Sequence, residues 1–255
     1  MTMPTPRWAA GLATLLIAGT VLAGVAPTSA AASPGTAAST AAIQRPGVVH
    51  PAQSASSALA GLTIKAKASS TGYTRDQFGT AWTDNQGAPG GHNGCDTRND
   101  VLRRDLTSKV IEADGCVVDS GHLSDPYAGK SISFVRGVGT STAVQIDHIV
   151  ALSDAWQTGA QSLTKAVRTN LANDPLNLWA VDGPTNESKG DKDAADWVPP
   201  KTSSDCMYVA RQVAIKKAYA LWVTQAEHDA IASVLASCPS FALPTESDWA
   251  VPAPS

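Results

Sequence analysis

The chain has 255 residues, a hydrophobic content of 43% and a formal net charge of −3, which allow one domain with a substantial core. Every acidic residue lies after position 75, so the part of the chain that can fold is more acidic than the whole. This balance excludes the broad basic surface that binds nucleic acid tightly, and it leaves room only for local basic clusters.

Residues 1–32 are typical of a secretory signal peptide. Arg7 is followed by an uncharged run from Trp8 to about Ala26 and then by small residues, PTSAAAS, that suit cleavage. A transmembrane anchor is the alternative, because the run is nearly long enough to span a bilayer, but its glycines and threonines favour cleavage. We therefore expect a secreted, extracellular protein without a membrane attachment.

Residues 33–60 are rich in Ala, Ser and Pro and contain few large apolar side chains. Such a segment cannot bury enough surface to offset its chain entropy, so we expect a disordered linker there. Large apolar residues recur steadily from residue 61 onward, which predicts one domain over residues 61–245 and a flexible tail over residues 246–255.

The four cysteines all lie in this domain. An even number in an exported chain predicts two disulfides, and sequence proximity favours Cys95 with Cys116 and Cys206 with Cys238 over the two other pairings. A zinc site is the alternative, but no Cys-x-x-Cys spacing occurs.

A short helix is predicted from about Thr97, with Asp96 or Thr97 itself as its cap. Arg98, Arg103 and Arg104 lie on this helix. They either pair with neighbouring aspartates on a solvated face or bind phosphate, and the sequence leaves both interpretations open.

Strands and helices are predicted to alternate in the middle of the domain. Two β-rich runs, CVV and SISFV, flank the turn formers SDPYAGK and predict a hairpin over residues 116–135. A strand should end at Asp147, and a second short strand should cover residues 177–182. Between them, residues 151–174 have a helical pattern that is interrupted near Gly159.

The C-terminal part is predicted to be two helices. Apolar and aromatic residues line one face of the first, and Thr224 with Glu227 forms a capping box that begins the second. A disulfide between Cys206 and Cys238 would tie the two as an antiparallel pair.

Asp147 and His148 are neighbours at the end of a strand, so their side chains point to opposite faces. With Asn177 and the string NESKGDK that starts at Asn186, they resemble the HNH, or ββα-metal, nuclease motif. In that motif a strand ends in Asp-His, a second strand begins at an Asn, and a following helix returns an Asn or His to a metal.

The resemblance extends to the HNH domain at the C-terminus of GmrSD-type modification-dependent restriction endonucleases, which also occurs in many small secreted bacterial proteins. It is carried by DHIVALSDAW, NDPLNL and NESKGDKDAADWVPP and covers most of residues 73–238. It implies an α+β fold with a ββα-metal core, a long helical insertion, an N-terminal hairpin and a C-terminal antiparallel helix pair stapled by a disulfide.

The resemblance also implies roles for four residues. Asp147 and Asn186 would hold one Mg²⁺ or Mn²⁺, a hard cation that prefers oxygen ligands. His148 would be the general base, since a neutral imidazole accepts a proton near neutral pH. Asn177 would orient the loop that holds His148.

Substrate contacts are the least determined part of the site. Lys189 either binds phosphate or is a solvated residue of an exposed turn, and Arg98 and Arg104 are further candidates for substrate binding. The other histidines are expected to be solvated, namely His50, His92, His122 and His228.

The leading hypothesis is a secreted, monomeric, metal-dependent endonuclease that hydrolyses phosphodiester bonds of DNA, with RNA as a second substrate. A serine or cysteine hydrolase is not supported, because a Gly-x-Ser-x-Gly elbow is absent and the cysteines are assigned to disulfides. The alternative is an inactive secreted binding module on a nuclease fold, which the acidic balance keeps open. The presence of all four site residues favours the enzyme.

Overall fold

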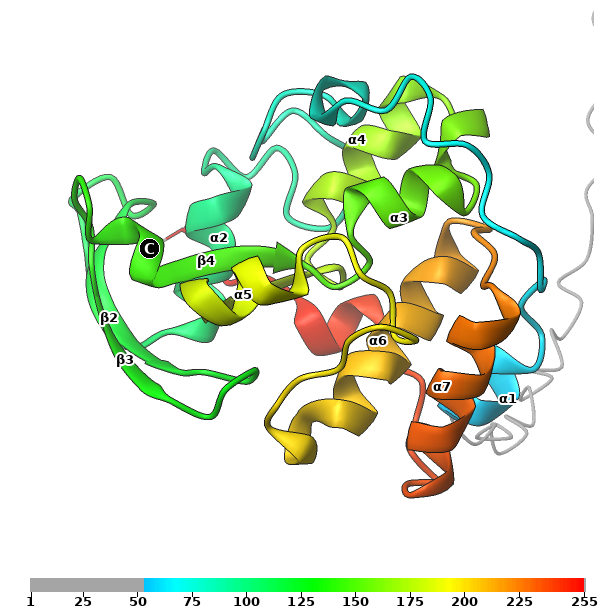
Figure 1. Cartoon of the computed structure of the whole chain (residues 1–255). Coiled ribbons are helices and arrows are strands. Elements are labelled where there is room, and N and C mark those ends of the chain that lie inside the picture. Colours follow the sequence, from blue (N-terminus) through cyan, green and yellow to red (C-terminus); the bar gives the residue numbers. More distant parts are fainter. Residues whose placement is uncertain (1–52, 255) are drawn as a thin grey trace, which may run out of the picture. The chain divides into compact units, whose positions relative to one another are not determined.

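The computed structural model describes residues 53–254 (Figure 1). The expected signal peptide and most of the expected linker lie outside these residues. The described part is a mixed α+β structure with one three-stranded and one two-stranded sheet. Within it, no helix combines the length and the apolar character needed to cross a membrane.

The strands are β1 (Thr107–Ile111), β2 (Val118–Ser124), β3 (Ser131–Val135), β4 (Val144–His148) and β5 (Leu178–Asp182). The α-helices are α1 (Ala55–Leu59), α2 (Thr97–Asp105), α3 (Leu152–Gln157), α4 (Lys165–Asn173), α5 (Gly183–Lys189), α6 (Asp205–Ala218) and α7 (Gln225–Ala236). Short 3-10 helices are η1 (Arg75–Phe78), η2 (Ser141–Ala143), η3 (Ala160–Ser162), η4 (Thr202–Ser204) and η5 (Glu246–Trp249).

The predicted hairpin is present as β2 and β3, with Leu123 opposite Ile132. It belongs to an antiparallel sheet in the order β1-β2-β3. The first strand, β1, was not predicted. Four of its five residues are exposed and its pairing with β2 is irregular, so its sequence lacks the alternation of apolar and polar residues that marks a half-buried strand.

The second sheet pairs β4 with β5 in antiparallel fashion, with His148 opposite Leu178. The chain leaves β4 for the insertion that contains α3 and α4, returns through β5, and turns at once into α5, whose N-cap is Asp182. Figure 1 shows α5 lying along β4. The carboxyl end of β4, the start of β5 and α5 are thereby brought together.

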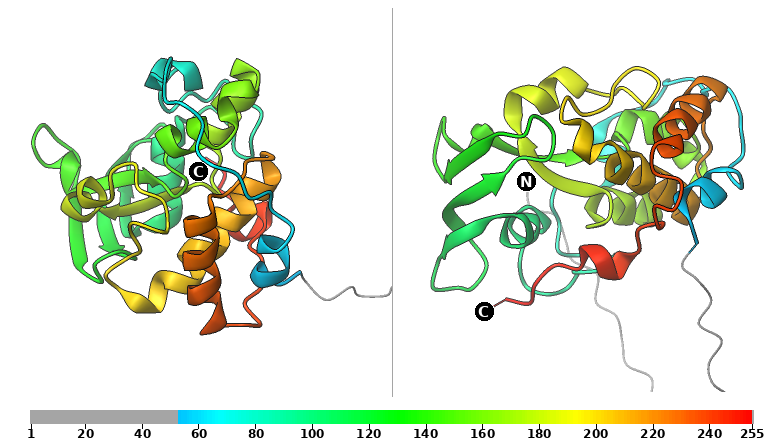
Figure 2. Two further views of the ribbon diagram at one scale, coloured as in Figure 1. Left: turned by 45° about the vertical axis from the view of Figure 1, so that its right-hand side comes forward. Right: turned by 90° about the horizontal axis from the view of Figure 1, so that it is seen from below.

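Helices α6 and α7 pack with α1 around one core (Figure 2). The capping box of Thr224 and Glu227 begins α7, as the sequence predicts. A disulfide joins Cys206, in the first turn of α6, to Cys238, after the end of α7, and the other disulfide is Cys95–Cys116. These are the two pairings that sequence proximity favours.

Both flanks of the domain extend further than the sequence predicts. Residues 53–60 were expected to belong to the linker, yet they include the buried helix α1, where small alanines allow close packing and only Leu59 is large. The expected tail likewise contains η5, and the Trp249 ring of η5 packs on Arg211, whose guanidinium carbon lies 3.4 Å from the ring centroid. Average composition over a window does not reveal such single anchoring residues.

Candidate active site

His148 lies at the end of β4 and is 8% exposed. Its Nε2 is 2.9 Å from the carbonyl oxygen of Ala172, in α4. Because a carbonyl only accepts hydrogen bonds, Nε2 carries the ring proton and Nδ1 keeps its free lone pair. Burial lowers the pKa of His148 to about 3. The imidazole is therefore held neutral, with one nitrogen able to accept a proton.

The indole of Trp82 stacks on the His148 ring, with the centroids 5.7 Å apart and the planes 12° from parallel. Trp82 has a left-handed backbone, with φ of 57°, which is costly for a bulky side chain. Its carbonyl oxygen accepts a hydrogen bond from the N–H of Thr97 at the start of α2. That bond fixes the conformation that places the indole on the imidazole.

Asp147 points to the opposite side and is almost completely buried. The hydroxyl of Tyr127 donates to its Oδ2 at 2.5 Å, and Nζ of Lys189 donates to its Oδ1 at 2.9 Å. Burial raises the pKa of Asp147, while Lys189 and Tyr127 act to lower it. The carboxylate is thus held in place by two donors.

The sequence left Lys189 open between phosphate binding and a solvated turn, and the structure makes it a buried residue instead. It is the last residue of α5 and is completely buried, and besides Asp147 it donates to the carbonyl oxygen of His148 at 2.9 Å. The burial of a lysine is unfavourable unless it is paired, and here the pairing is with the site itself. Its two hydrogen bonds hold the Asp147 carboxylate and the backbone of His148 together.

Asn177 is completely buried just before β5. Its Oδ1 accepts from the N–H of Val150 at 2.9 Å, and its Nδ2 donates to the carbonyl oxygens of Leu171 and Val150 at 3.3 and 3.4 Å. These bonds join the residues that follow His148 to α4. Asn177 thus holds the loop after His148 in a fixed position relative to α4.

Asn186 lies on α5 with a fixed amide orientation. Gln145 donates through Nε2 to the carboxylate of Glu187 at 3.0 Å, so its Oε1 is left to accept from Nδ2 of Asn186 at 2.9 Å. The Oδ1 of Asn186 has no hydrogen bond from any of residues 53–254. It remains free to bind a cation.

Two hollows flank His148. The first, called the polar hollow, measures about 220 Å³, and its lining includes Asp147, His148, Asn186, Asp191 and Tyr73. The second, called the apolar hollow, measures about 290 Å³, and its lining includes Phe78, Trp82, Leu152 and Ala172. Arg75, His148 and Leu152 line both. The structure therefore brings three of the four predicted site residues to one hollow and places Asn177 behind them.

The residues of the 73–82 segment were not predicted as site residues. The sequence signal was an arginine among aromatics, TGYTRDQFGTAW, near the start of the predicted domain. Only the packing of η1 against α4 brings this segment to His148.

Arg98 and Arg104 were candidates for substrate binding, and the structure gives them internal partners instead. Arg98 donates to the carbonyl oxygens of Ser141 and Val144 at 3.3 and 3.1 Å. Arg104 is paired with Asp105 and donates to the carbonyl oxygens of Pro175 and Leu178 at 2.9 and 2.6 Å. A guanidinium has five donors in a rigid fork, and these two use them to join α2 to the second sheet.

The polar hollow fits a hard divalent cation. Asn186 offers a free amide oxygen, and each carboxylate oxygen of Asp147 accepts one hydrogen bond, from Tyr127 or Lys189, and keeps a second lone pair. One carboxylate and one amide oxygen, completed by water and phosphate oxygens, match the ligand set that Mg²⁺ prefers.

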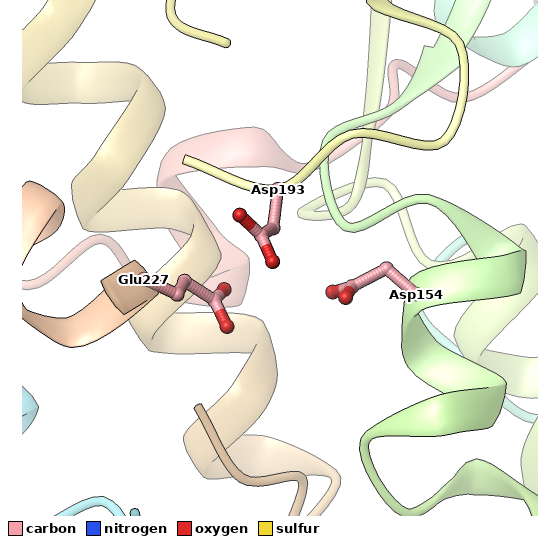
Figure 3. Close-up of side chains that lie close together, drawn as sticks. All are labelled: Asp154, Asp193 and Glu227. Atoms are coloured by element: carbon pink, nitrogen blue, oxygen red, sulfur yellow. The ribbon is translucent and has the colours of Figure 1, made fainter. Parts of the chain in front are cut away.

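A second acidic cluster, Asp154, Asp193 and Glu227, brings its oxygens within 4.8 Å of one another (Figure 3). Two lysines already pair with it. Lys67 is 3.0 and 2.9 Å from Asp154 and Asp193, and Lys216 is 3.0 and 2.7 Å from Asp154 and Glu227. The ammonium groups occupy the place of a cation, so we describe this cluster as a buried ion network rather than a metal centre.

Comparison with known proteins gives one family and one relative. The sequence model of the family "GmrSD restriction endonucleases, C-terminal domain" matches residues 96–234. A protein of Arthroderma benhamiae named "Uncharacterized secreted protein" is 37% identical over 199 residues, which are 77% of this chain and 90% of the relative. No solved structure matches.

Proposed function

The chain belongs to the family of the C-terminal domain of GmrSD restriction endonucleases, and from this premise we propose that it is a secreted, metal-dependent endonuclease of the HNH type that hydrolyses DNA. The observation that carries the proposal is the convergence of Asp147, His148 and Asn186 on the polar hollow. Secretion is supported by the two disulfides, which persist in oxidising compartments, and by the name of the relative.

His148 is proposed to take a proton from the attacking water through Nδ1. The hydrogen bond from Nε2 to Ala172 fixes the tautomer, and the stacked Trp82 fixes the plane of the ring. A divalent cation held by Asp147 and Asn186 would acidify nearby water, which eases proton transfer to an imidazole of low proton affinity, and would neutralise charge at the phosphate.

The elements β4, β5 and α5 carry the proposed catalytic and metal-binding groups in the same order along the chain as the HNH motif. Asp147 and Asn186 would hold Mg²⁺ or Mn²⁺ in the polar hollow, with Lys189 and Tyr127 keeping the Asp147 carboxylate in position. Asn177 would keep the loop after His148 in register with α4. A group held in a single orientation raises the effective concentration of the reacting atoms.

The proposal is tested by incubating the purified mature protein with supercoiled plasmid and Mg²⁺ or Mn²⁺, with and without a chelator. Cleavage that stops on chelation is expected. His148→Ala should lower the rate by on the order of 10² to 10⁴, the usual contribution of a general base.

The matched control is His122→Ala, because His122 is an exposed histidine on β2. This variant should cleave like the wild type. A wild type that is inactive with both metals, or a His148→Ala variant that is fully active, would contradict the proposal. Inactivity combined with oligonucleotide binding would favour the binding module.

A further inference from the structure

Arg75 is an exposed residue at the start of η1, and it lines both hollows beside His148. It makes no ion pair and no side-chain hydrogen bond with any residue between 53 and 254. Its position before residue 96 places it outside the part of the chain that the family model matches. An unpaired guanidinium beside the proposed catalytic base is free to bind an anion from solution.

The loop that carries Arg75 is fixed to α4. Nε of Arg168 donates to the carbonyl oxygen of Gln77 at 2.8 Å, and Phe78 is buried in the core beneath. Gly79 has φ of 85°, and a Cβ there would collide with Thr169 of α4. Since Ala172 of the same helix holds His148, one helix positions both the guanidinium-bearing loop and the imidazole.

The apolar hollow continues from Arg75 along the same segment. Phe78, Trp82 and Leu152 supply large apolar walls, and Thr80 lies at the hollow and is exposed. Apolar and aromatic walls with a cationic neighbour suit a nucleobase attached to a phosphate. The chain has a net negative charge, so few of its side chains are available to contact phosphates. Contacts with the base must therefore supply more of the affinity for nucleic acid.

We propose that residues 73–82 form a nucleotide subsite in which Arg75 pairs with a backbone phosphate and the apolar hollow receives an unstacked base, so that single strands are preferred to duplexes. A paired base is stacked inside the duplex and must leave the stack to enter a pocket. The inference rests on the proposed function, because it names the substrate of the same site.

The test measures binding without turnover. The mature protein in a chelator is titrated into a fluorescein-labelled single-stranded 12-mer, and anisotropy is followed at several salt concentrations. Each phosphate contact on a single strand contributes about 0.7 to the slope of log K against log salt. Arg75→Gln should weaken binding about tenfold at low salt and reduce the slope by about that amount, whereas Arg75→Lys should retain most of the slope.

The matched control is Lys165→Gln. Lys165 is an exposed cation in the first turn of α4 that lines neither hollow, so its loss changes the net charge equally. The control should keep the wild-type slope. Equal slopes for Arg75→Gln and Lys165→Gln would overturn the inference.

The base contact is tested with Thr80→Trp, which should partly fill the apolar hollow. This variant should weaken binding of the 12-mer several-fold but leave an abasic strand of equal length unaffected, and the wild type should bind the matching duplex at least tenfold more weakly. Equal affinity for duplex and single strand, together with no effect of Thr80→Trp, would overturn the inference.

Failure of the subsite and failure of the nuclease proposal give different results. If the wild type cleaves plasmid but its binding of the 12-mer does not depend on Arg75, the nuclease proposal stands and the subsite is wrong. If the wild type binds the 12-mer through Arg75 but cleaves with neither metal, the subsite stands and the nuclease proposal is wrong. A wild type that binds no oligonucleotide overturns the subsite.

Discussion

The ammonium of Lys189 lies completely buried between the Asp147 carboxylate and the carbonyl of His148. Removal of one partner of a buried pair leaves an uncompensated charge, which costs about 3 to 5 kcal/mol. Lys189→Met should therefore lower the free energy of unfolding in urea by about this amount. The exposed Lys192 provides the control, and Lys192→Met should change stability by less than about 0.5 kcal/mol. Equal stability of the two variants would contradict a charged Asp147.

Asn177 makes three bonds that hold the loop after His148, and none of them reaches the surface. Asn177→Ala leaves the N–H of Val150 without an acceptor, so we expect a loss of about 1 to 3 kcal/mol in unfolding free energy. On the proposed mechanism, kcat should fall on the order of tenfold to 100-fold with little change in KM, because only the base is misplaced. Asn85→Ala, at an exposed asparagine, should alter neither quantity.

Single residues differ in how well the sequence predicts them. Asp147 is near the end of β4, Asn177 directly precedes β5 and Asn186 lies on the helix that follows, so their meeting can be inferred from the motif. The long side chains of Lys189 and Arg104 cannot be placed in this way, because their burial depends on tertiary partners such as the carbonyls of distant segments. Arg75 was missed because it reaches His148 through the packing of η1 against α4, which no local pattern indicates.

Secondary structure elements with a strong local signal were predicted well. The hairpin of β2 and β3, the strands β4 and β5, and the capping box of α7 all follow from alternation, turn residues or a cap. The exposed strand β1 has no such alternation, and the N-cap of the small-residue helix α1, Ser54, is one of several serines in its stretch of the sequence. Both exist because neighbouring elements supply hydrogen bonds or an apolar surface.

The two disulfides should differ in their effect on activity. The Cys95–Cys116 and Cys206–Cys238 pairs close loops of 21 and 32 residues, so the replacement of either pair by serine should cost roughly 3 to 4 kcal/mol. The first also anchors the start of α2, whose Thr97 holds Trp82 against His148. We therefore expect the double variant Cys95→Ser, Cys116→Ser to cleave more slowly than the wild type and the other double variant to cleave at the wild-type rate. Both rates are measured well below the melting temperatures of the two variants. Equal activity of the two double variants would contradict this distinction.

The buried ion network connects five separate parts of the molecule. It contains Lys67 from the N-terminal segment, Asp154 of α3, Asp193 after α5, Lys216 of α6 and Glu227 of α7. Three carboxyl groups face two ammonium groups, so one carboxyl can keep a proton without loss of charge balance. Burial raises the pKa of Glu227 to about 7. Burial also acts to raise the pKa of Asp154, but Lys216 and Lys67 lower it overall.

This assignment predicts how stability depends on pH. Folded Glu227 keeps its proton to about pH 7, whereas its ordinary pKa is 4.5, so its contribution is complete below pH 4.5 and is lost as the pH rises toward 7. The loss is at most about 3.4 kcal/mol, since the pKa differs by about 2.5 between the two states and one pKa unit corresponds to 1.36 kcal/mol. Glu227→Gln should remove this part of the slope in urea unfolding between pH 5 and 8.

The control for that measurement is Asp154→Asn, which removes a carboxylate that stays charged. It should destabilise the protein at every pH in this range and shift the slope toward lower pH without removing it, because the Asp154 carboxylate helps to raise the pKa of Glu227. A Glu227→Gln variant with the wild-type slope would show that another group carries the proton.

The two flanks of the domain are bonded to each other, since Ala55 donates to the carbonyl of Phe241 and Leu243 donates to that of Gln53. During synthesis the amino end emerges first, so these partners cannot pair until almost the whole chain has been made. Completion of the fold is therefore a final event of synthesis, and a message truncated shortly after Cys238 would yield a product whose earliest helix never finds its closing contacts.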